Sequence, residues 1–457
     1  MTGKTMVIGL DGVPHWILRK FAADGTMPHV ASLFEQGTLR PLQAPLPDIS
    51  STSWATFLTG ANPGQHGIYG FNDFQPGSYE NYFPNLSDFA VPPLWEPIQK
   101  NGLVSLLINV PSTYPAPTIS GAVISGFVAP DFQRAVTPRY LLPLLKSLNY
   151  ELDVEVGDVQ SNPIAFIDHA TRCLSRRCIA FDQLLDYIDW DLAICVITET
   201  DRIHHFLWSS VVDPTARMYP MLVDFYRTVD KAIAGLDKKA GPDTSLLLVS
   251  DHGFGPVHTQ VCINSYLRQQ GILALPHDAA ALSEIGPDTV AFALDPARIY
   301  LNDIERFPNG RRFTEAEREF TLARLIERLT ELRVWCRDEE RTVISRTWRA
   351  RELYSGSRLR KAPDLVAVPT PGFQLRGTWA EPNLTMESPL TGTHTPDDAL
   401  FWQRGEFSDG AVDMIDVAPT VLASLGLPRA VSMEGRVLTT SPTVEKSSYQ
   451  CNPRSKP

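Results

Sequence analysis

The chain has 457 residues and a formal net charge of −11, with 43% hydrophobic and 20% charged residues. This length is enough for a large hydrophobic core, and the acidic balance argues against a general nucleic-acid-binding surface. No apolar run approaches the roughly 18 residues of a membrane helix. The run at 6–10 is too short for a signal-peptide core, so we expect a soluble, cytoplasmic protein. The six cysteines include no Cys-x-x-Cys pair, which argues against a disulfide framework or a thiolate metal site.

Short runs rich in valine, isoleucine and leucine alternate along the chain with longer segments of helical periodicity. The runs predicted to be buried strands are 6–10, 103–108, 192–197, 246–249 and 365–368. The segments predicted to be helices are 163–185, 219–236 and 314–334. Strands that alternate with helices predict an α/β fold, with a mainly parallel central sheet flanked by helices.

Two stretches fit this sheet poorly. Residues 71–97 are rich in asparagine, proline and aromatic residues, and residues 256–362 mix helical periodicity with frequent proline, arginine and glutamate. We expect both to be insertions that form a cap over the site, within one domain that spans 1–440. The polar segment 441–457 has the composition of a disordered tail.

Acidic residues follow three of the predicted strands. Asp11 follows the first, Asp201 comes soon after the third, and Asp251 and His252 follow the fourth. In open α/β sheets the functional site lies beyond the carboxyl ends of the strands, so these residues are expected to meet in one crevice. For Asp11 alone, ordinary turn chemistry is an equally good explanation.

Two further candidate ligands are histidines. Asp201 and His205 are four positions apart, which suits two ligands of one metal ion on a helix face but also suits a solvated face. His394, taken alone, is more typical of a loop histidine than of a ligand. The metal-site hypothesis therefore depends on the combination of these acids and histidines.

A hydroxyl-rich segment at 47–60 predicts a loop that enters a short helix ending at Gly60. A hydroxyl at a helix N-terminus lies where free backbone N–H groups favour a phosphate, and a nearby dication would lower the pKa of that hydroxyl. A plain helix cap is the alternative interpretation.

Taken together, these segments resemble the alkaline phosphatase superfamily. Within it they resemble the type I phosphodiesterase/nucleotide pyrophosphatase family, including its bacterial predicted phosphohydrolases and phosphomutases. The resemblance runs almost from end to end. It is carried by VIGLDG at 7–12, FLTGANPGQHGI at 57–68, NVPSTYP at 109–115, VSDHGFG at 249–255, GTHT at 392–395 and DVAPTVL at 416–422.

The resemblance implies a hydrolase with two divalent metal ions, for which we favour zinc over manganese. One ion would be held by Asp201, His205 and His394. The other would be held by Asp11, Ser50, Asp251 and His252. The family's nucleophile is commonly threonine, and counting back from FLTG places Ser50 there, with Ser51 and Thr52 as alternatives.

Three other polar residues lie in or near these motifs. The family carries an asparagine that binds a phosphoryl oxygen, and Asn72, one residue further along than expected, is the candidate; an ordinary loop residue is the alternative. His66, in a turn, is expected to have a structural hydrogen-bonding role. His204 adjoins His205 and is expected to point elsewhere.

The implied activity is hydrolysis of a small-molecule phosphate diester or phosphoanhydride through a phosphoseryl intermediate. A phosphomonoesterase or phosphomutase is the alternative. A sulfatase is disfavoured, because Ser50 is followed by Ser-Thr-Ser-Trp instead of the x-Pro-x-Arg of sulfatases. A binding protein that has lost its chemistry is disfavoured because every ligand position is filled. Neither the substrate nor the oligomeric state follows from the sequence.

Overall fold

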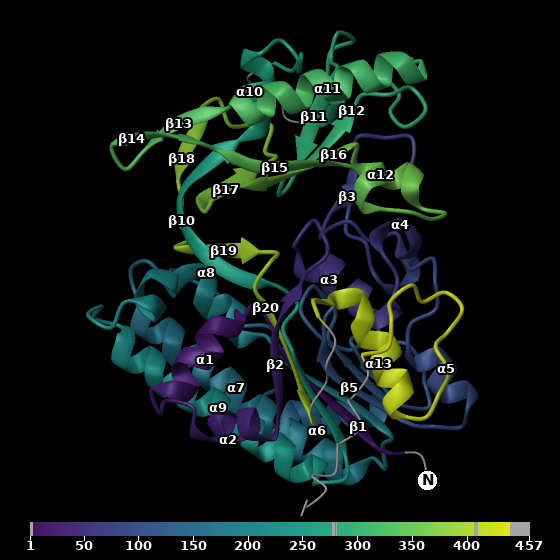
Figure 1. Cartoon of the computed structure of the whole chain (residues 1–457), viewed down its shortest axis with the longest axis vertical. Coiled ribbons are helices and arrows are strands. Elements are labelled where there is room, and N and C mark those ends of the chain that lie inside the picture. The colour runs from purple at the N-terminus through teal and green to yellow at the C-terminus, as the bar shows by residue number, and fades with distance from the viewer. Residues whose placement is uncertain (1–2, 277–278, 280, 406–409, 439–457) are drawn as a thin grey trace, which may run out of the picture.

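The computed structural model describes residues 3–276, 279, 281–405 and 410–438, so the predicted tail at 441–457 lies outside the described residues. Figure 1 shows two lobes, a larger lower lobe that contains the central sheet and a smaller upper lobe built from the middle of the chain. β10 (Gly253–Cys262) runs from one lobe into the other.

The central sheet has nine strands in the order β21-β2-β20-β9-β1-β8-β5-β6-β7. Its middle five strands are parallel to one another. They are β9 (Ser245–Val249), β1 (Thr5–Leu10), β8 (Leu192–Ile197), β5 (Ser105–Val110) and β6 (Gly121–Ser125). The outer strands are β2 (Gly37–Gln43), β20 (Ala399–Arg404), β7 (Val136–Thr137) and β21 (Val412–Asp413). The prediction of an α/β fold with a mainly parallel sheet is confirmed.

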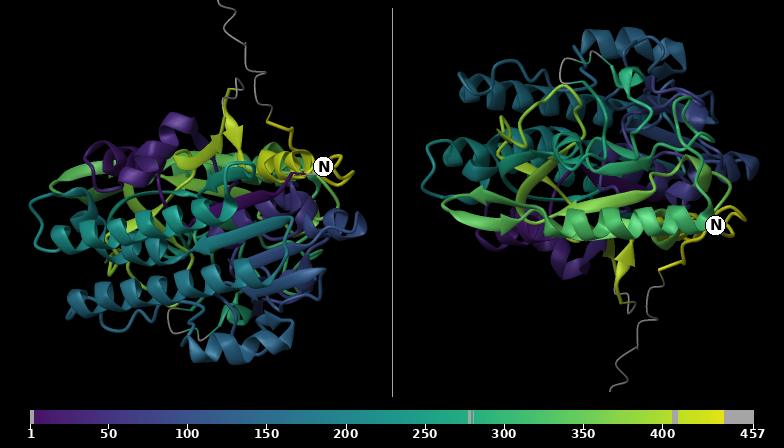
Figure 2. Two further views of the ribbon diagram at one scale, coloured as in Figure 1. Left: turned by 90° about the horizontal axis from the view of Figure 1, so that it is seen from below. Right: turned by 90° about the horizontal axis from the view of Figure 1, so that it is seen from above.

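Helices cover both faces of this sheet (Figure 2). Met6 and Ile8 pack into one core with α1 (His15–Ala23), α2 (Pro28–Gln36), α7 (Pro163–Tyr187) and α9 (Tyr219–Ala240), whereas Val7 packs into a second core with α3 (Ser50–Thr59), α5 (Trp95–Lys100) and α13 (Val417–Ser424). This alternation follows from the two-residue period of a strand, and burial on both faces explains why these strands are apolar throughout.

The upper lobe has its own hydrophobic core. One of its sheets has the order β17-β10-β18, with β19 also paired to β10, and the other has the order β11-β12-β16-β15. These strands are β11 (Ala291–Leu294), β12 (Arg298–Leu301), β15 (Ile344–Arg349), β16 (Leu365–Pro369), β17 (Gly372–Arg376), β18 (Thr385–Glu387) and β19 (Gly392–Thr395). Its helices include α10 (Ile263–Gln269), α11 (Glu315–Glu331) and α12 (Ala350–Leu353).

Two predictions for this region need correction. The run 365–368 is a strand, but β16 pairs antiparallel with β12 and β15 in the upper lobe and is no part of the central sheet. Hydrophobicity predicts that such a run is buried without specifying its partner strands. The helix predicted over 314–334 ends at Glu331, and Arg333–Cys336 forms β13, which pairs with β14 (Glu339–Thr342).

The segment 71–97 connects the two lobes. Phe74, in β3 (Asp73–Phe74), and Tyr79 pack into the upper core, whereas Leu94 and Trp95 pack into a lower core. The elements of the upper lobe continue past residue 362 to β18, so more chain contributes to it than the segment 256–362.

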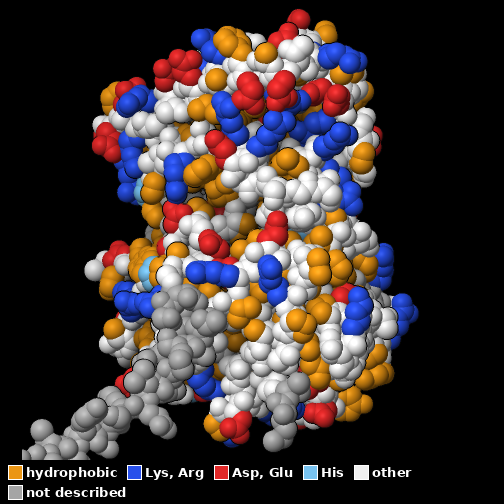
Figure 3. Space-filling view, turned by 45° about the vertical axis from the view of Figure 1, so that its right-hand side comes forward, with side chains coloured by type: hydrophobic (Ala, Val, Ile, Leu, Met, Phe, Trp, Pro, Cys, Tyr) orange, Lys and Arg blue, Asp and Glu red, His pale blue; other side chains and the backbone are white. Residues whose placement is uncertain are grey.

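Acidic and basic side chains are mixed over the surface of the upper lobe (Figure 3). Ion pairs join α11 to its neighbours, among them Arg351 with Glu315 and Arg349 with Glu319. Among the described helices, none combines the length and apolar character needed to cross a membrane.

Candidate functional site

The register of the central strands brings their carboxyl ends to one edge of the sheet. Leu10 of β1 lies opposite Ile197 of β8, and Gly9 lies opposite Val249 of β9. The residues that follow these strands therefore lie close together, as the parallel arrangement predicts. The structure brings together Asp11, Ser50, Asp201, His205, Asp251, His252 and His394.

Asp201 and His205 lie on one face of α8 (Glu199–Val212), and His394 reaches them from β19. Asp201 Oδ1 lies 3.3 Å from His205 Nε2 and 3.4 Å from His394 Nε2, and the two Nε2 atoms are 3.0 Å apart. Ligands bound ~2.0–2.1 Å from a tetrahedral zinc ion lie ~3.3 Å from one another. The three atoms thus have the spacing of one face of such a site.

A second group surrounds His252 Nε2. The hydroxyl oxygen of Ser50 lies 3.1 Å from this nitrogen, Asp251 Oδ2 lies 3.3 Å from it, and Asp11 Oδ1 lies 3.8 Å from it. All four residues are buried. The two groups are adjacent, because Asp201, His252 and His394 also offer ligand atoms within 4.8 Å of one another.

The three imidazoles are oriented by backbone carbonyl groups. The Nδ1 atom of His394 lies 2.8 Å from the Asp48 carbonyl, that of His252 lies 3.0 Å from the Gly253 carbonyl, and that of His205 lies 3.3 Å from the Gly392 carbonyl. A carbonyl oxygen only accepts, so each Nδ1 carries the proton. The lone pair of each Nε2 therefore points into the site, as in most metal-binding histidines.

The carboxylates follow the same pattern, with one oxygen held and the other directed inward. Trp54 Nε1 donates to Asp11 Oδ2 over 3.1 Å, and Gly12 N donates to Asp251 Oδ1 over 3.0 Å. Arg202 lies 3.2 Å from Asp201 Oδ2. The buried opposite oxygens, Oδ1 of Asp11 and Asp201 and Oδ2 of Asp251, accept no hydrogen bond of acceptable geometry within the described part of the chain. Buried carboxylate oxygens left in this way suit a cation.

Burial and neighbouring charges shift the pKa values of the acids and histidines of this site in different directions. Burial, with the charges of Asp251 and Asp201, raises the pKa of Asp11 well above its ordinary value. Burial also raises the pKa of Asp251 to about 7. For Asp201, burial opposes ionisation, but His205, His394 and Arg202 overcome it and hold the pKa well below its ordinary value. Burial lowers the pKa of His252, which keeps its imidazole neutral.

The hydroxyl of Ser50 is placed by α3, which begins at this residue and ends before Gly60, whose positive φ of 59° terminates the helix. The prediction of a short helix closed by Gly60 is confirmed. Of the three candidate nucleophiles, Ser50 is the one whose hydroxyl contacts a predicted ligand. The hydroxyls of Ser51 and Thr52 are buried and make no hydrogen bond with any described group.

A cavity of about 330 Å³ opens beside His205 and His394, between the two lobes. The lower lobe contributes Asp48 and Phe71, and the upper lobe contributes Gln374 and Arg376. Most of the remaining lining is apolar, as is common for a small-molecule site.

Asn72 also lines this cavity, and its side chain is held by an arginine of the upper lobe. The guanidinium of Arg298 donates to the Asn72 backbone carbonyl over 2.8 Å and to Asn72 Oδ1 over 2.6 Å. Arg298 is fully buried in a space that Gly70 leaves open, since a Cβ at residue 70 would lie 2.8 Å from the guanidinium carbon. With Oδ1 engaged, the amide nitrogen of Asn72 is left to donate.

The two histidines expected to lie outside the ligand set, His66 and His204, make hydrogen bonds within the fold. His66 Nε2 lies 3.0 Å from the Thr56 hydroxyl, and the Ile68 N–H donates to His66 Nδ1 over 3.1 Å. His204 Nδ1 lies 2.7 Å from the Gly12 carbonyl, and its Nε2 lies 2.5 Å from the Tyr226 hydroxyl. Both rings are fully buried.

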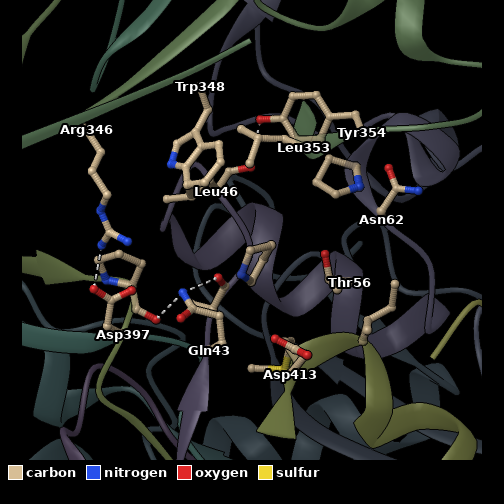
Figure 4. A pocket seen from close by; sticks show the side chains of 16 residues that line it. Gln43, Leu46, Thr56, Asn62, Arg346, Trp348, Leu353, Tyr354, Asp397 and Asp413 are labelled. Atoms are coloured by element: carbon tan, nitrogen blue, oxygen red, sulfur yellow. Dashed lines mark hydrogen bonds and ion pairs between the residues drawn. The ribbon is translucent and has the colours of Figure 1, made fainter. Parts of the chain in front are cut away.

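A second cavity, with a volume of about 330 Å³, lies beside α3. Figure 4 shows the side chains that line it. Thr56 and Asp413 line it from the lower lobe, and Trp348 and Tyr354 line it from the upper lobe. The predicted metal ligands are not among its lining residues. The convergent acids and histidines thus belong to the first cavity.

Sequence reasoning did not identify the residues that hold the site together. Trp54, Arg202 and Arg298 were not singled out, and neither was the Asp48 carbonyl. Trp54 carried a usable signal, because it lies one helical turn after Ser50 in a segment already expected to be helical. Arg298 carried none, since its partner Asn72 is more than 200 residues away in sequence.

Residues 5–397 match the family model described as type I phosphodiesterase/nucleotide pyrophosphatase. No match was found among curated proteins.

Solved structures with the same fold were also found. A phosphonoacetate hydrolase from Sinorhizobium meliloti, in complex with phosphonoformate, has a TM-score of 0.64 and 15% identity, with 93% of this chain and 96% of that chain covered. The murine ectonucleotide pyrophosphatase/phosphodiesterase 5, inactive and in complex with AMP, has a TM-score of 0.58 and 14% identity, with 94% and 96% covered. At these identities the likeness shows a shared fold.

Proposed function

Because the chain belongs to the type I phosphodiesterase/nucleotide pyrophosphatase family, it is a phosphoester hydrolase, and we propose that it cleaves phosphate diesters or phosphoanhydrides at a two-metal centre. Asp201, His205 and His394 would hold one divalent ion. Asp11, Ser50, Asp251 and His252 would hold the other. We favour zinc, because the ligand atoms are nitrogens and oxygens at tetrahedral spacing, with manganese as the alternative.

The orientation of the ligands carries this proposal. Each histidine donates a hydrogen bond from Nδ1–H to a backbone carbonyl and turns Nε2 inward, and each carboxylate has one oxygen held and one directed inward. The Nε2 atoms of His205 and His394 bring two lone pairs within 3.0 Å of each other. A cation between them removes that repulsion, so the residues fit the ions.

The proposed reaction begins at Ser50. Its hydroxyl oxygen attacks phosphorus, the new Ser–O–P bond forms as the ester or anhydride P–O bond breaks, and the leaving group takes up a proton. Water then cleaves the bond between phosphorus and the Ser50 oxygen, which restores the hydroxyl and releases the remaining phosphate monoester. When bound, the ions would lower the pKa of the Ser50 hydroxyl and stabilise charge on the leaving oxygen.

Other groups of the chain would position the substrate. The first backbone N–H groups of α3 face the phosphate of a substrate attacked by Ser50. The Asn72 amide nitrogen, with its oxygen held by Arg298, would donate to a non-bridging phosphoryl oxygen. The cavity between the lobes would take the rest of a small-molecule substrate, with Phe71 and Arg376 among its walls.

The test compares kcat/KM for bis-p-nitrophenyl phosphate, p-nitrophenyl phosphate and phosphonoacetate. Protein stripped with a chelator is reloaded with zinc or with manganese, and a chelated sample is the control. We expect metal-dependent turnover that favours the diester. Phosphonoacetate is included because a phosphonoacetate hydrolase has the same fold.

Each other result has a definite meaning. Preference for the monoester would replace the proposal with a phosphomonoesterase or phosphomutase. Preference for phosphonoacetate would indicate cleavage of a carbon–phosphorus bond. Turnover that survives chelation, or no turnover of any substrate, would contradict the two-metal mechanism.

A further inference from the structure

A separate group of metal-ligating side chains lies where α7 meets the segment that follows α6 (Leu142–Ser147). The carboxylate of Glu151, the imidazole of His169 and the thiol of Cys173 offer ligand atoms that all lie within 4.8 Å of one another. None of these residues belongs to the catalytic site. The absence of a Cys-x-x-Cys pair had argued against a thiolate site, but a mixed set of ligands needs only one cysteine.

The spacing of this group fits a zinc-like ion. Glu151 Oε2 lies 3.3 Å from His169 Nε2, and Cys173 Sγ lies 3.6 Å from the same nitrogen. With Zn–N and Zn–O of ~2.0–2.1 Å and Zn–S of ~2.3 Å, tetrahedral ligands lie ~3.3 Å apart for nitrogen and oxygen and ~3.6 Å apart for nitrogen and sulfur. Both observed distances agree with these values.

Local structure explains why the three side chains converge. His169 and Cys173 are four positions apart on α7, so the helix places them on one face. Glu151 approaches that face from the preceding segment. The thiol is buried, whereas the side chains of His169 and Glu151 are 22% and 29% exposed, so the group opens to solvent on one side. An ion has an entry path there, and water has access to a fourth position.

The neighbouring contacts hold the imidazole and the carboxylate in place. The Glu155 backbone N–H donates to the one lone pair of His169 Nε2 over 3.3 Å, so an ion at this nitrogen would replace that long hydrogen bond. Arg176 Nη1 lies 2.5 Å from Glu151 Oε1 and so holds one carboxylate oxygen, while Oε2 faces the imidazole.

We propose that Glu151, His169 and Cys173 bind one divalent transition-metal ion of the zinc type, with water as the fourth ligand. Binding releases the thiol proton of Cys173 to solvent, because the thiolate is the ligand. The ion fastens the segment before α7 to the helix and takes no part in phosphate-ester hydrolysis.

Cobalt substitution tests this proposal without reference to activity. The proposed catalytic ligands are all oxygens and nitrogens, so a thiolate-to-cobalt charge-transfer band in the near-ultraviolet can come only from a site with cysteine. We expect this band in Co²⁺-loaded protein, and we expect Cys173→Ser to abolish it. Cys178→Ser, on the same helix, is the matched control and should retain the band.

Metal content gives the second readout. Zinc-loaded Cys173→Ser and His169→Gln should each hold about one equivalent less per chain than the unsubstituted protein, with kcat/KM for a phosphodiester changed less than about twofold. His169→Gln changes a partly exposed residue, so it reports on the site even if replacing the buried thiol disturbs folding. A missing band in the unsubstituted protein, a band that survives Cys173→Ser, or unchanged metal content in both variants would overturn the proposal.

Discussion

Ser50 is the residue on which the proposed reaction depends. Its hydroxyl lies 3.1 Å from His252 Nε2, at the first residue of α3. Ser50→Ala should lower kcat by at least about 1,000-fold, because losing a nucleophile removes the covalent route. The zinc content of the variant should stay within about 20% of normal, since the other ligands remain. Initial-rate assays and metal analysis check this prediction.

Ser51→Ala is the matched control, because Ser51 is the next residue of the same helix and its hydroxyl is also buried. This control should retain kcat within a few fold. If Ser50→Ala retains activity and Ser51→Ala or Thr52→Val loses it, the nucleophile is one of these neighbours. If all three variants turn over normally, water attacks phosphorus directly.

Asn72 and Arg298 form a pair whose interdependence can be measured. Asn72→Ala should lower kcat/KM by about 10- to 100-fold, the effect of a lost hydrogen bond to a charged group. Arg298→Lys should lower it by about 10-fold, because an ammonium group cannot hold the backbone carbonyl and Oδ1 of Asn72 with one planar fork. The double variant should resemble Asn72→Ala, since Arg298 acts through Asn72.

The control for this pair is Arg306→Lys, which changes another upper-lobe arginine that is ion-paired with Asp364. It should leave kcat/KM unchanged within about twofold. Losses that multiply in the Asn72→Ala, Arg298→Lys double variant would show that Arg298 affects catalysis by a route independent of Asn72. Melting temperatures of all variants separate this effect from a general loss of stability.

The convergence of the proposed ligand residues could be predicted from sequence, because these residues follow strands or lie in distinctive short motifs. Asp251 and His252 come directly after a run of buried residues, which is visible in the sequence. The groups that orient them are backbone atoms or distant side chains, such as the Gly12 N–H that donates to Asp251. These contacts depend on which strands are neighbours, and a single sequence does not carry that information.

At the scale of elements, His66 joins α4 (Pro63–His66) to α3, which carries the proposed nucleophile, by its contact with Thr56. Burial lowers the pKa of His66 to about 3, against about 6.5 in the unfolded chain. Between these values the unfolded state binds the extra proton, so this residue makes stability fall as pH falls below about 6.5. The loss approaches ~1.4 kcal/mol per pH unit.

Urea unfolding at pH 7 and pH 5 checks this prediction. His66→Gln should lose less stability between these pH values than the unsubstituted protein does, by about 2 kcal/mol. Thr56→Val removes the hydrogen bond but keeps the titrating ring, so it should show the unsubstituted pH dependence. Equal pH dependence in His66→Gln and the unsubstituted protein would show that the ring does not remain neutral in the folded state.

Elements with a strong periodic signal could be predicted closely. The strand at 192–197 and the start of α7 at residue 163 agree with the structure. The end of the helix predicted over 314–334 was not predicted correctly. One residue separates α11 from β13, and Arg333–Cys336 is a strand because it pairs with β14. Pairing of that kind is a tertiary contact, and helical periodicity gives no warning of it.

At the scale of the whole molecule, the chain leaves the central sheet through β10, builds the upper lobe and returns through β19, which carries His394. Insertions in loops are well tolerated because lengthening a loop costs little entropy. The change in composition over 256–362 predicted an insertion of this kind. The separate core that the upper lobe builds from residues of β11, β12 and β16 could not be predicted from the sequence. The cavity proposed to take the substrate lies between the lobes, so its walls come from both of them.

The returning strand makes the proposed metal centre a link between distant parts of the chain. Asp11 and Asp251 follow central strands, Asp201 lies in the first turn of α8, and His394 arrives after the upper lobe is complete. In the unfolded chain these residues are far apart, so the proposed ions would bind only the folded state. At a free metal concentration of 100 times Kd, each site would stabilise the fold by ~2.7 kcal/mol.

A chelator should therefore lower the melting temperature by several degrees, reversibly. The melting temperatures should be measured in the Cys173→Ser variant, so that the proposed metal site on α7 does not contribute to the effect of the chelator. His394→Ala should reduce the chelator effect by breaking the link to β19. Equal melting temperatures with and without chelator would mean that the seven side chains hold their positions without ions.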